Sequence, residues 1–154
     1  MLFGLAAGLV GAAGMTALQA TPTAAAVLQS EEDDPLVGTW DVTFSDVNVD
    51  TPPRHATALF LPGGGLLNVQ ENFPTAGVGT WGRDEGNSAS FKVVQWDYRD
   101  GIPAARVELT GVVHRGPHDA HDTIFGTYTS AVSRNGVVFE RGSFKFFGER
   151  LTAG

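Results

Sequence analysis

Short runs in which apolar and polar residues alternate follow one another from residue 35 to residue 151. A period of two is typical of strands that bury one face. No stretch of useful length in this part of the sequence shows the helical period of 3.6 residues. The pattern predicts eight strands, over residues 36–46, 55–61, 66–72, 78–83, 88–98, 104–114, 123–133 and 137–151.

Glycine, proline and asparagine mark the connections between these runs. Residues 62–65 read Pro-Gly-Gly-Gly, and the pairs Asp100-Gly101 and Asn135-Gly136 favour tight hairpin turns. Because short connections make neighbouring strands antiparallel, the predicted sheet is antiparallel throughout.

Eight antiparallel strands in simple order favour an up-and-down barrel, since closing the sheet removes both of its edges. We therefore expect an all-β fold, an eight-stranded antiparallel up-and-down β-barrel over residues 35–154. A flattened sandwich of two sheets is the alternative. Residues 48–54, with two prolines, form the one long early connection and could act as a lid.

Two short motifs carry a resemblance to a known family. Gly38, Thr39 and Trp40 stand at the head of the first predicted strand, and Arg150 stands at the end of the last. This looks like the Gly-x-Trp opening of lipocalin-like barrels. Residues 77–81, Gly-Val-Gly-Thr-Trp, match a Gly-x-Gly-x-Trp stretch of small secreted bacterial lipocalin-like proteins of the calycin type.

The resemblance covers roughly residues 35–151 and implies both a structural pair and a function. In lipocalins an arginine of the last strand packs across the tryptophan, so Arg150 is expected to lie over Trp40. Such a cation–π contact contributes about 0.5–2 kcal/mol. The family also implies that a small apolar molecule binds inside the barrel. The chain departs from typical lipocalins in having no cysteine and no obvious C-terminal helix.

Composition and charge exclude several classes of function. The formal net charge is −7 and the sequence has no cluster of lysine or arginine, so a nucleic-acid partner is not expected. With no cysteine, disulfide and thiolate chemistry are excluded. The sequence has no nucleophile elbow, phosphate loop or dinucleotide fingerprint, so we expect no cofactor and do not favour an enzyme.

The first 26 residues carry no charge and are nearly all apolar. They end in Ala24, Ala25 and Ala26 after a Thr-Pro-Thr break, a pattern that predicts a secretory signal peptide cut after Ala26, or else a membrane anchor. Residues 27–34 end in four acidic residues and are expected to be a solvated linker. The protein is therefore expected to be secreted or extracytoplasmic, and to be held at a membrane through residues 1–26 if they are not cleaved.

The alternation also selects a candidate ligand-binding face. Eight strands enclose a lumen that is either filled by side chains or holds one small ligand. Leu61, Leu67 and Phe146 are expected to face inward. Trp96 and Tyr98 face outward if Phe91 points inward, and they line the lumen if the register is reversed. The residues assigned to ligand binding are Phe44, Leu59, Val69, Phe91, Val93, Leu109, Phe125 and Phe144.

Polar residues on these faces support one alternative function. Glu71, Gln95 and Tyr128 are candidate catalytic groups if the barrel is an isomerase or cyclase of the allene oxide cyclase type, but solvation at the rims is the favoured interpretation of such residues. The third alternative is a structural or assembly protein that uses the exposed aromatics and the apolar N-terminus. The oligomeric state is left open.

One loop has the residue types of a metal site. His118 and His121 alternate with aspartates between the sixth and seventh strands, and imidazole with carboxylate can hold a divalent ion. A solvated turn explains the same residues, and we expect no metal site.

Overall fold

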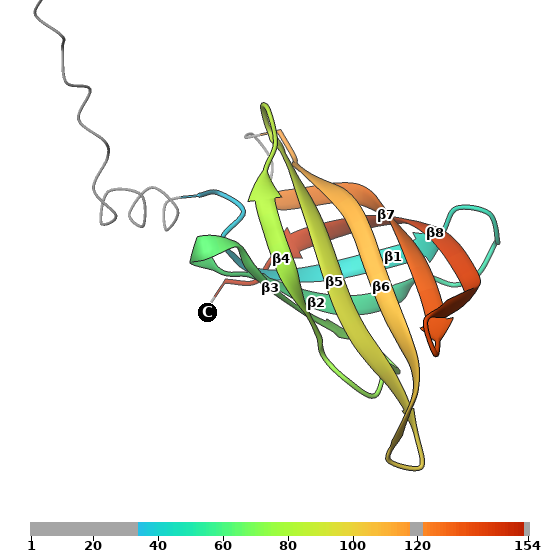
Figure 1. Ribbon diagram of the computed structural model, residues 1–154. Helices are drawn as coiled ribbons and strands as arrows, with labels where there is room; N and C mark the ends of the chain where they lie inside the picture. The colour runs from blue at the N-terminus through green and yellow to red at the C-terminus, as the bar shows by residue number, and fades with distance from the viewer. Residues whose placement is uncertain (1–33, 118–121, 153–154) are drawn as a thin grey trace, which may run out of the picture.

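Eight antiparallel strands pair in chain order and close into a barrel, in which β8 is hydrogen-bonded to β1 (Figure 1). The computed structural model describes residues 34–117 and 122–152. A 3₁₀ turn, η1 (Pro62–Gly64), joins the second strand to the third. The closed barrel confirms the predicted fold class, and the strand ends differ from the prediction by at most two residues. The strands are β1 (Gly38–Asp46), β2 (Arg54–Phe60), β3 (Gly65–Gln70), β4 (Gly77–Arg83), β5 (Ser88–Arg99), β6 (Ile102–Arg115), β7 (Thr123–Arg134) and β8 (Val137–Arg150).

Two hairpins turn at the dipeptides that predicted them. Asp100 and Gly101 connect β5 to β6 with φ angles of 53° and 75°. Asn135 and Gly136 connect β7 to β8 with φ angles of 50° and 79°. Two successive positive φ angles are typical of the primed turn whose twist matches that of the flanking strands.

The register between strands decides which side chains of β2 point inward. Directly opposed residues of an antiparallel pair lie on the same face of the sheet. Val42 and Trp40 are buried and stand opposite Ala56 and Ala58, so the two alanines face the lumen. The prediction that Leu59 and Leu61 face inward is therefore wrong.

The same register passes on to β3. Ala58 is opposite Asn68, and this pairing turns Asn68 inward. Leu67 and Val69, predicted to face the lumen, consequently point outward, and Val69 is 53% exposed. Leucine is more apolar than alanine, so hydrophobicity alone favours Leu59 over Ala58 as the inward residue. In the barrel, the small Ala58 is the residue that stands opposite Trp40.

Phe125 on β7 is a further correction. Ile124 is fully buried and Tyr128 nearly so, which places residues of even number on the inner face of β7. Phe125 is predicted to face the lumen, but it points outward and is 45% exposed. Its ring stacks on His114 of β6, with centroids 5.3 Å apart.

One end of the barrel is closed by the tryptophan that opens β1. Trp40 is fully buried and its Nε1 donates a hydrogen bond to the carbonyl oxygen of Leu36 (2.9 Å). The Arg150 guanidinium lies over the indole, 4.2 Å from the ring centroid, as the resemblance implies. Arg150 also donates to the carbonyl oxygens of Val37 (2.7 Å) and Pro35 (2.6 Å).

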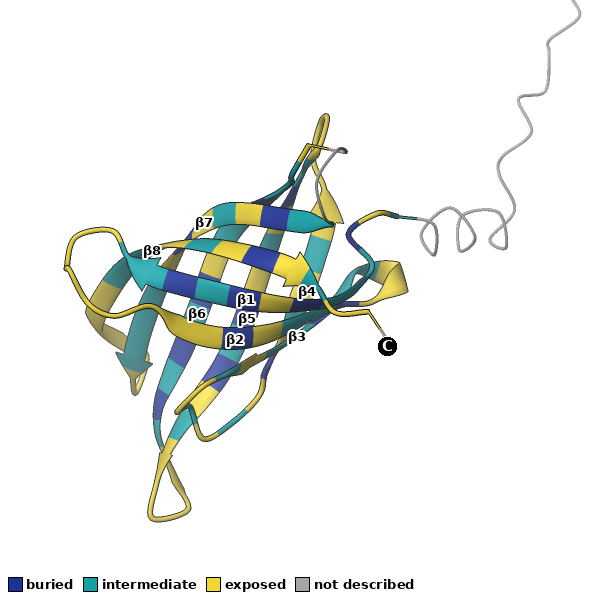
Figure 2. Ribbon diagram, turned by 180° about the vertical axis from the view of Figure 1, so that it is seen from behind, coloured by how far each residue is buried: buried dark blue, intermediate teal, exposed yellow. Residues whose placement is uncertain are grey.

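The opposite end of the barrel is the open one. In Figure 1 the described chain begins and ends at the closed end, beside the β2–β3 turn, and the β1–β2 loop lies at the other end. Figure 2 shows exposed segments at the hairpin tips and buried segments alternating along the strands. Within the described residues, no helix is long and apolar enough to span a membrane.

Candidate functional site

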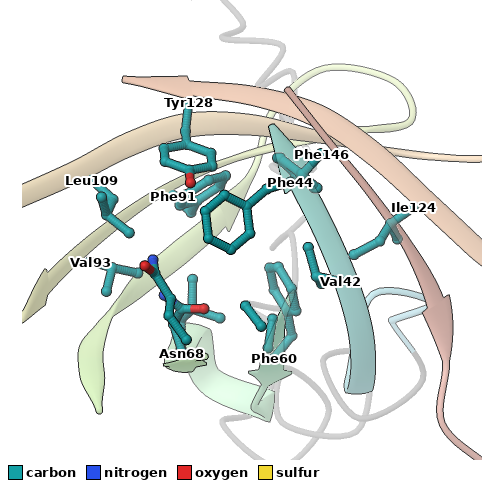
Figure 3. A pocket seen from close by; sticks show the side chains of 14 residues that line it. Val42, Phe44, Phe60, Asn68, Phe91, Val93, Leu109, Ile124, Tyr128 and Phe146 are labelled. Carbon is teal, nitrogen blue, oxygen red and sulfur yellow. The ribbon is translucent and has the colours of Figure 1, made fainter. Parts of the chain in front are cut away.

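A cavity of about 50 Å³ lies in the lumen (Figure 3). The side chains around it come from seven of the eight strands, with β4 contributing none. All but three of them are apolar, so the site favours a molecule with little charge. The cavity is lined by Val42, Phe44, Ala56, Ala58, Phe60, Leu66, Asn68, Gln70, Phe91, Val93, Leu109, Ile124, Tyr128 and Phe146.

Glycines in the wall make room for the aromatic rings of the lumen. A Cβ at Gly111 would lie 2.8 Å from the Phe91 ring and 2.6 Å from Tyr128 Cβ. A Cβ at Gly126 would lie 2.7 Å from the Phe146 ring. Both contacts are too close for a methyl group, so these glycines determine where the aromatic rings can sit.

An aromatic cluster stands between the cavity and the open end. The rings of Tyr128 and Phe144 stack with centroids 4.8 Å apart, and Phe44 meets Phe144 edge-on at 6.2 Å. The Arg54 guanidinium lies 4.9 Å from the Phe44 centroid and 5.5 Å from that of Phe144. Phe44 and Tyr128 of this cluster also line the cavity, so these rings form part of its wall.

The polar side chains of the lumen are two amides on β3, a buried amide on β5 and a phenol on β7. Asn68 and Gln70 are partly buried lining residues. Gln95 is 1% exposed, and its Oε1 has no hydrogen-bond partner among the described residues. Figure 3 shows the Tyr128 hydroxyl directed into the pocket and Asn68 on the opposite side.

The environment of Tyr128 keeps its hydroxyl neutral. Burial raises the pKa of Tyr128 above its usual value near 10, and the nearby Asp46 carboxylate raises it further, while Arg54 lowers it. The balance is upward, so the phenol holds its proton at physiological pH. Tyr128 can therefore donate a hydrogen bond in the lumen, but it is poorly suited to act as a phenolate base.

The three candidate catalytic groups do not form one site. Gln95 and Tyr128 are buried inside the barrel, but Glu71 is exposed just beyond the end of β3. Glu71 lines an open groove, whose other wall includes Val49, Thr51, Pro52 and Pro53 of the β1–β2 loop. The carboxylate is thus solvated at the rim.

Most of the predicted ligand-binding face does meet in the lumen. Phe44, Phe91, Val93 and Leu109 line the cavity, and Phe144 packs on Phe44 at its edge. Leu59, Val69 and Phe125 do not reach it. The lining residues that the pattern missed include Ala56, Ala58, Asn68 and Gln70, and pairing β2 against the well-predicted β1 would have found them.

The candidate metal-ligating residues cannot be placed. His118 and His121 lie outside the described residues. Within residues 34–117 and 122–152, no group of three or more metal-ligating side chains comes together.

Comparison of the chain with known proteins identifies no family. No protein-family model, curated protein or solved structure matches the chain. The site is therefore interpreted from its own residues.

Proposed function

We propose that the barrel binds a small, neutral, apolar molecule in its lumen. The observation that carries this proposal is the cavity in the lumen, which is lined almost wholly by apolar side chains. Such a cavity lowers the free energy of an apolar ligand by removing its surface from water. The resemblance to lipocalin-like barrels, which rests on the topology and on the packing of Arg150 over Trp40, supports the same function.

The size of the cavity limits the ligand. At about 50 Å³ it is smaller than the ~150 Å³ cavity that accommodates benzene in another protein. A ligand must therefore be compact, or the lumen must widen when the rings of Phe44, Tyr128 and Phe144 change rotamer. Rotation of Phe44 or Phe144 would disturb ring packing and the contacts with Arg54, but it would break no side-chain hydrogen bond.

A matched pair of leucine variants tests lumen binding. Leu109 lines the cavity, whereas Leu67 lies on the outer face of β3. Leu109→Phe fills the space and should weaken binding of an uncharged environment-sensitive dye at least tenfold, while Leu67→Phe should leave the affinity unchanged. Circular dichroism verifies that both variants fold. Equal affinities in the two variants would count against a lumen site.

Native mass spectrometry of the full chain provides a direct test. A small molecule that copurifies with the unmodified chain and is lost from Leu109→Phe would identify the ligand class. Dye titration of the same preparation, after extraction of any bound molecule, shows whether the emptied lumen binds again. If the dye fails to bind at every concentration at which the barrel stays folded, the proposal is wrong.

An apolar row on the outer surface favours assembly as a second candidate function. Leu59, Leu67, Val78 and Val94 stand side by side across β2, β3, β4 and β5, and Val78 is 60% exposed. The partner we propose is a second copy of the chain. Lys92 and Glu108 beside the row form an ion pair with each other (2.9 Å), so this surface presents both charges, and a two-fold-related copy would meet each of them with the opposite one. Val78→Lys should convert a dimer to a monomer in analytical ultracentrifugation, and a monomeric unmodified chain would exclude this assembly.

We also propose that the barrel acts outside the cytoplasm. The support is the uncharged apolar sequence of residues 1–26 with its alanines at 24–26, all outside the described residues. N-terminal sequencing of protein recovered from the medium tests it: a chain that begins at Val27 is expected. Protein that stays in the cell with residues 1–26 attached would contradict secretion.

A further inference from the structure

A buried polar atom without a partner lies beside the lumen cavity. Gln95 Oε1 has no hydrogen-bond partner among the described residues, and the whole residue is 1% exposed. Nearly every buried polar group in a folded protein has such a partner, because an unpaired one loses its hydration without compensation. Gln95 therefore carries a cost that an apolar residue at the same position would avoid.

The surroundings of Gln95 connect its amide to the cavity. A Cβ at Gly77 would lie 3.0 Å from Gln95 Oε1 and 2.5 Å from Val93 Cγ1. Val93 lines the cavity, and Gly77 stands opposite Asn68, which also lines it. The amide thus occupies the space that the missing side chain of Gly77 leaves next to the cavity wall. The last torsion of a glutamine side chain is broad, so a small rotation can turn the amide toward the cavity.

We infer that the lumen ligand carries a neutral hydrogen-bond donor, a hydroxyl or N–H group, and that Gln95 Oε1 accepts it. This inference rests on the proposed binding in the lumen and specifies the chemistry of the ligand. None of the described side chains that line the cavity is charged, so a charged group would lose its hydration there without a counter-ion. The ligand class is a compact apolar alcohol, phenol or N–H heterocycle.

Two further polar groups can complete the recognition of such a donor. The Tyr128 hydroxyl points into the cavity and stays protonated, and Asn68 faces it from β3 (Figure 3). A hydroxyl ligand has acceptor lone pairs as well as a proton, and these can receive hydrogen bonds from the phenol or the Asn68 amide. A purely apolar molecule would leave the buried Gln95 Oε1 unsatisfied.

The test compares three small probes with the full unmodified chain. Phenol offers a donor, fluorobenzene is close to it in shape without a donor, and anisole offers an acceptor only. Isotope-labelled protein is titrated with each probe, and side-chain amide and backbone shifts report the affinity and the site. We expect phenol to bind about tenfold more tightly than fluorobenzene, with the largest amide shift at Gln95.

A pair of amide variants assigns the preference to one side chain. Gln95→Met keeps the length of the side chain and removes the amide, so phenol and fluorobenzene should then bind equally. Asn87→Leu removes an amide that is exposed in the turn between β4 and β5 and does not line the cavity, so the preference for phenol should remain.

The outcomes separate this inference from the proposed function. Equal binding of phenol and fluorobenzene to the unmodified chain would overturn the inference alone, since a water molecule would then satisfy Gln95. Stronger binding of anisole than of phenol would overturn it too, because the site would be donating. Absence of binding by all three probes, together with failure of the larger dye, would overturn the lumen site itself and this inference with it.

Discussion

The two ends of the barrel differ in how completely their polar groups are paired. At the closed end, Trp40 Nε1 donates to Leu36 and the Arg150 guanidinium donates to two carbonyl oxygens and to Asp122. In the lumen toward the open end, a buried amide of Gln95 has no partner among the described residues. The hydrogen bonds of the closed end therefore stabilise the fold. The lumen, in contrast, retains an acceptor without a partner, to which a ligand can donate a hydrogen bond.

The same contrast appears in packing. Leu36, Trp40 and Val113 at the closed end are fully buried. The lumen, by comparison, contains a cavity. The aromatic rings that surround it make no side-chain hydrogen bonds in the described structure. Stability and binding are thus assigned to different parts of one sheet, and the following predictions test that division.

The largest expected effect is the loss of the tryptophan of the closed end. Trp40→Ala should lower the free energy of unfolding by about 3–5 kcal/mol, because it leaves a large cavity and removes the ring beneath Arg150. Trp96→Ala, at a position 43% exposed on the outer face, should cost far less. Urea denaturation of both variants measures the difference, and equal costs would break the distinction between the closed end and the outer surface.

The next effect concerns the glycines that shape the lumen. Gly126→Ala should destabilise the barrel by about 1–3 kcal/mol, because the new methyl group would clash with the Val112 carbonyl oxygen and lie 2.7 Å from the Phe146 ring. Gly82→Ala on β4 is the control, since a Cβ there meets nothing within 4 Å. Thermal unfolding monitored by circular dichroism compares them; a neutral Gly126→Ala would mean that the lumen aromatics can move aside freely.

A smaller effect of opposite sign is expected at the unpaired amide. Gln95→Met should raise the free energy of unfolding by about 1 kcal/mol, because it removes a buried acceptor without a partner. Gln70→Met, at a partly exposed site, should change stability by less than that. Denaturant titration without ligand provides the measurement. A loss of stability in Gln95→Met would show that the amide is satisfied in solution.

The smallest effect is pH-dependent and concerns Asp122. Burial alone would raise the pKa of Asp122, but hydrogen bonds from Arg115 and Arg150 outweigh it and leave the pKa below its usual value. Because the folded-state pKa is the lower one, this stabilisation is present above about pH 4 and is lost as the pH falls through the folded pKa. The Asp122 side chain is about one-third exposed, so solvent screening keeps the contribution below about 1 kcal/mol.

The pH dependence of one variant makes this prediction measurable. Asp122→Asn should be less stable than the unmodified chain at pH 7, and the two should converge as the pH falls below about 4. Asp50→Asn, in the exposed β1–β2 loop, serves as the control and should follow the unmodified chain at every pH. A difference between Asp122→Asn and the unmodified chain that stays constant down to low pH would show that the Asp122 carboxylate charge contributes nothing.

Sequence alone determined the strands and their order. Period-two alternation and the Asp100-Gly101 and Asn135-Gly136 turns located the strands because both are local properties of the chain. The pair of Trp40 and Arg150 followed from motifs at the two ends of the barrel sequence. These features depend on short-range chemistry or on a recognisable motif, so they could be predicted without coordinates.

Only the tertiary structure decided which faces of β2, β3 and β7 turn inward and how much space they leave. On these strands both alternating sets contain apolar residues, as Ala58 beside Leu59 and Ile124 beside Phe125 show, so hydrophobicity does not choose between them. The choice comes from pairing with the neighbouring strand, since a shift of one residue reverses every side chain. The unpaired amide of Gln95 and the size of the cavity follow from that packing, because each depends on side chains contributed by strands far apart in the sequence.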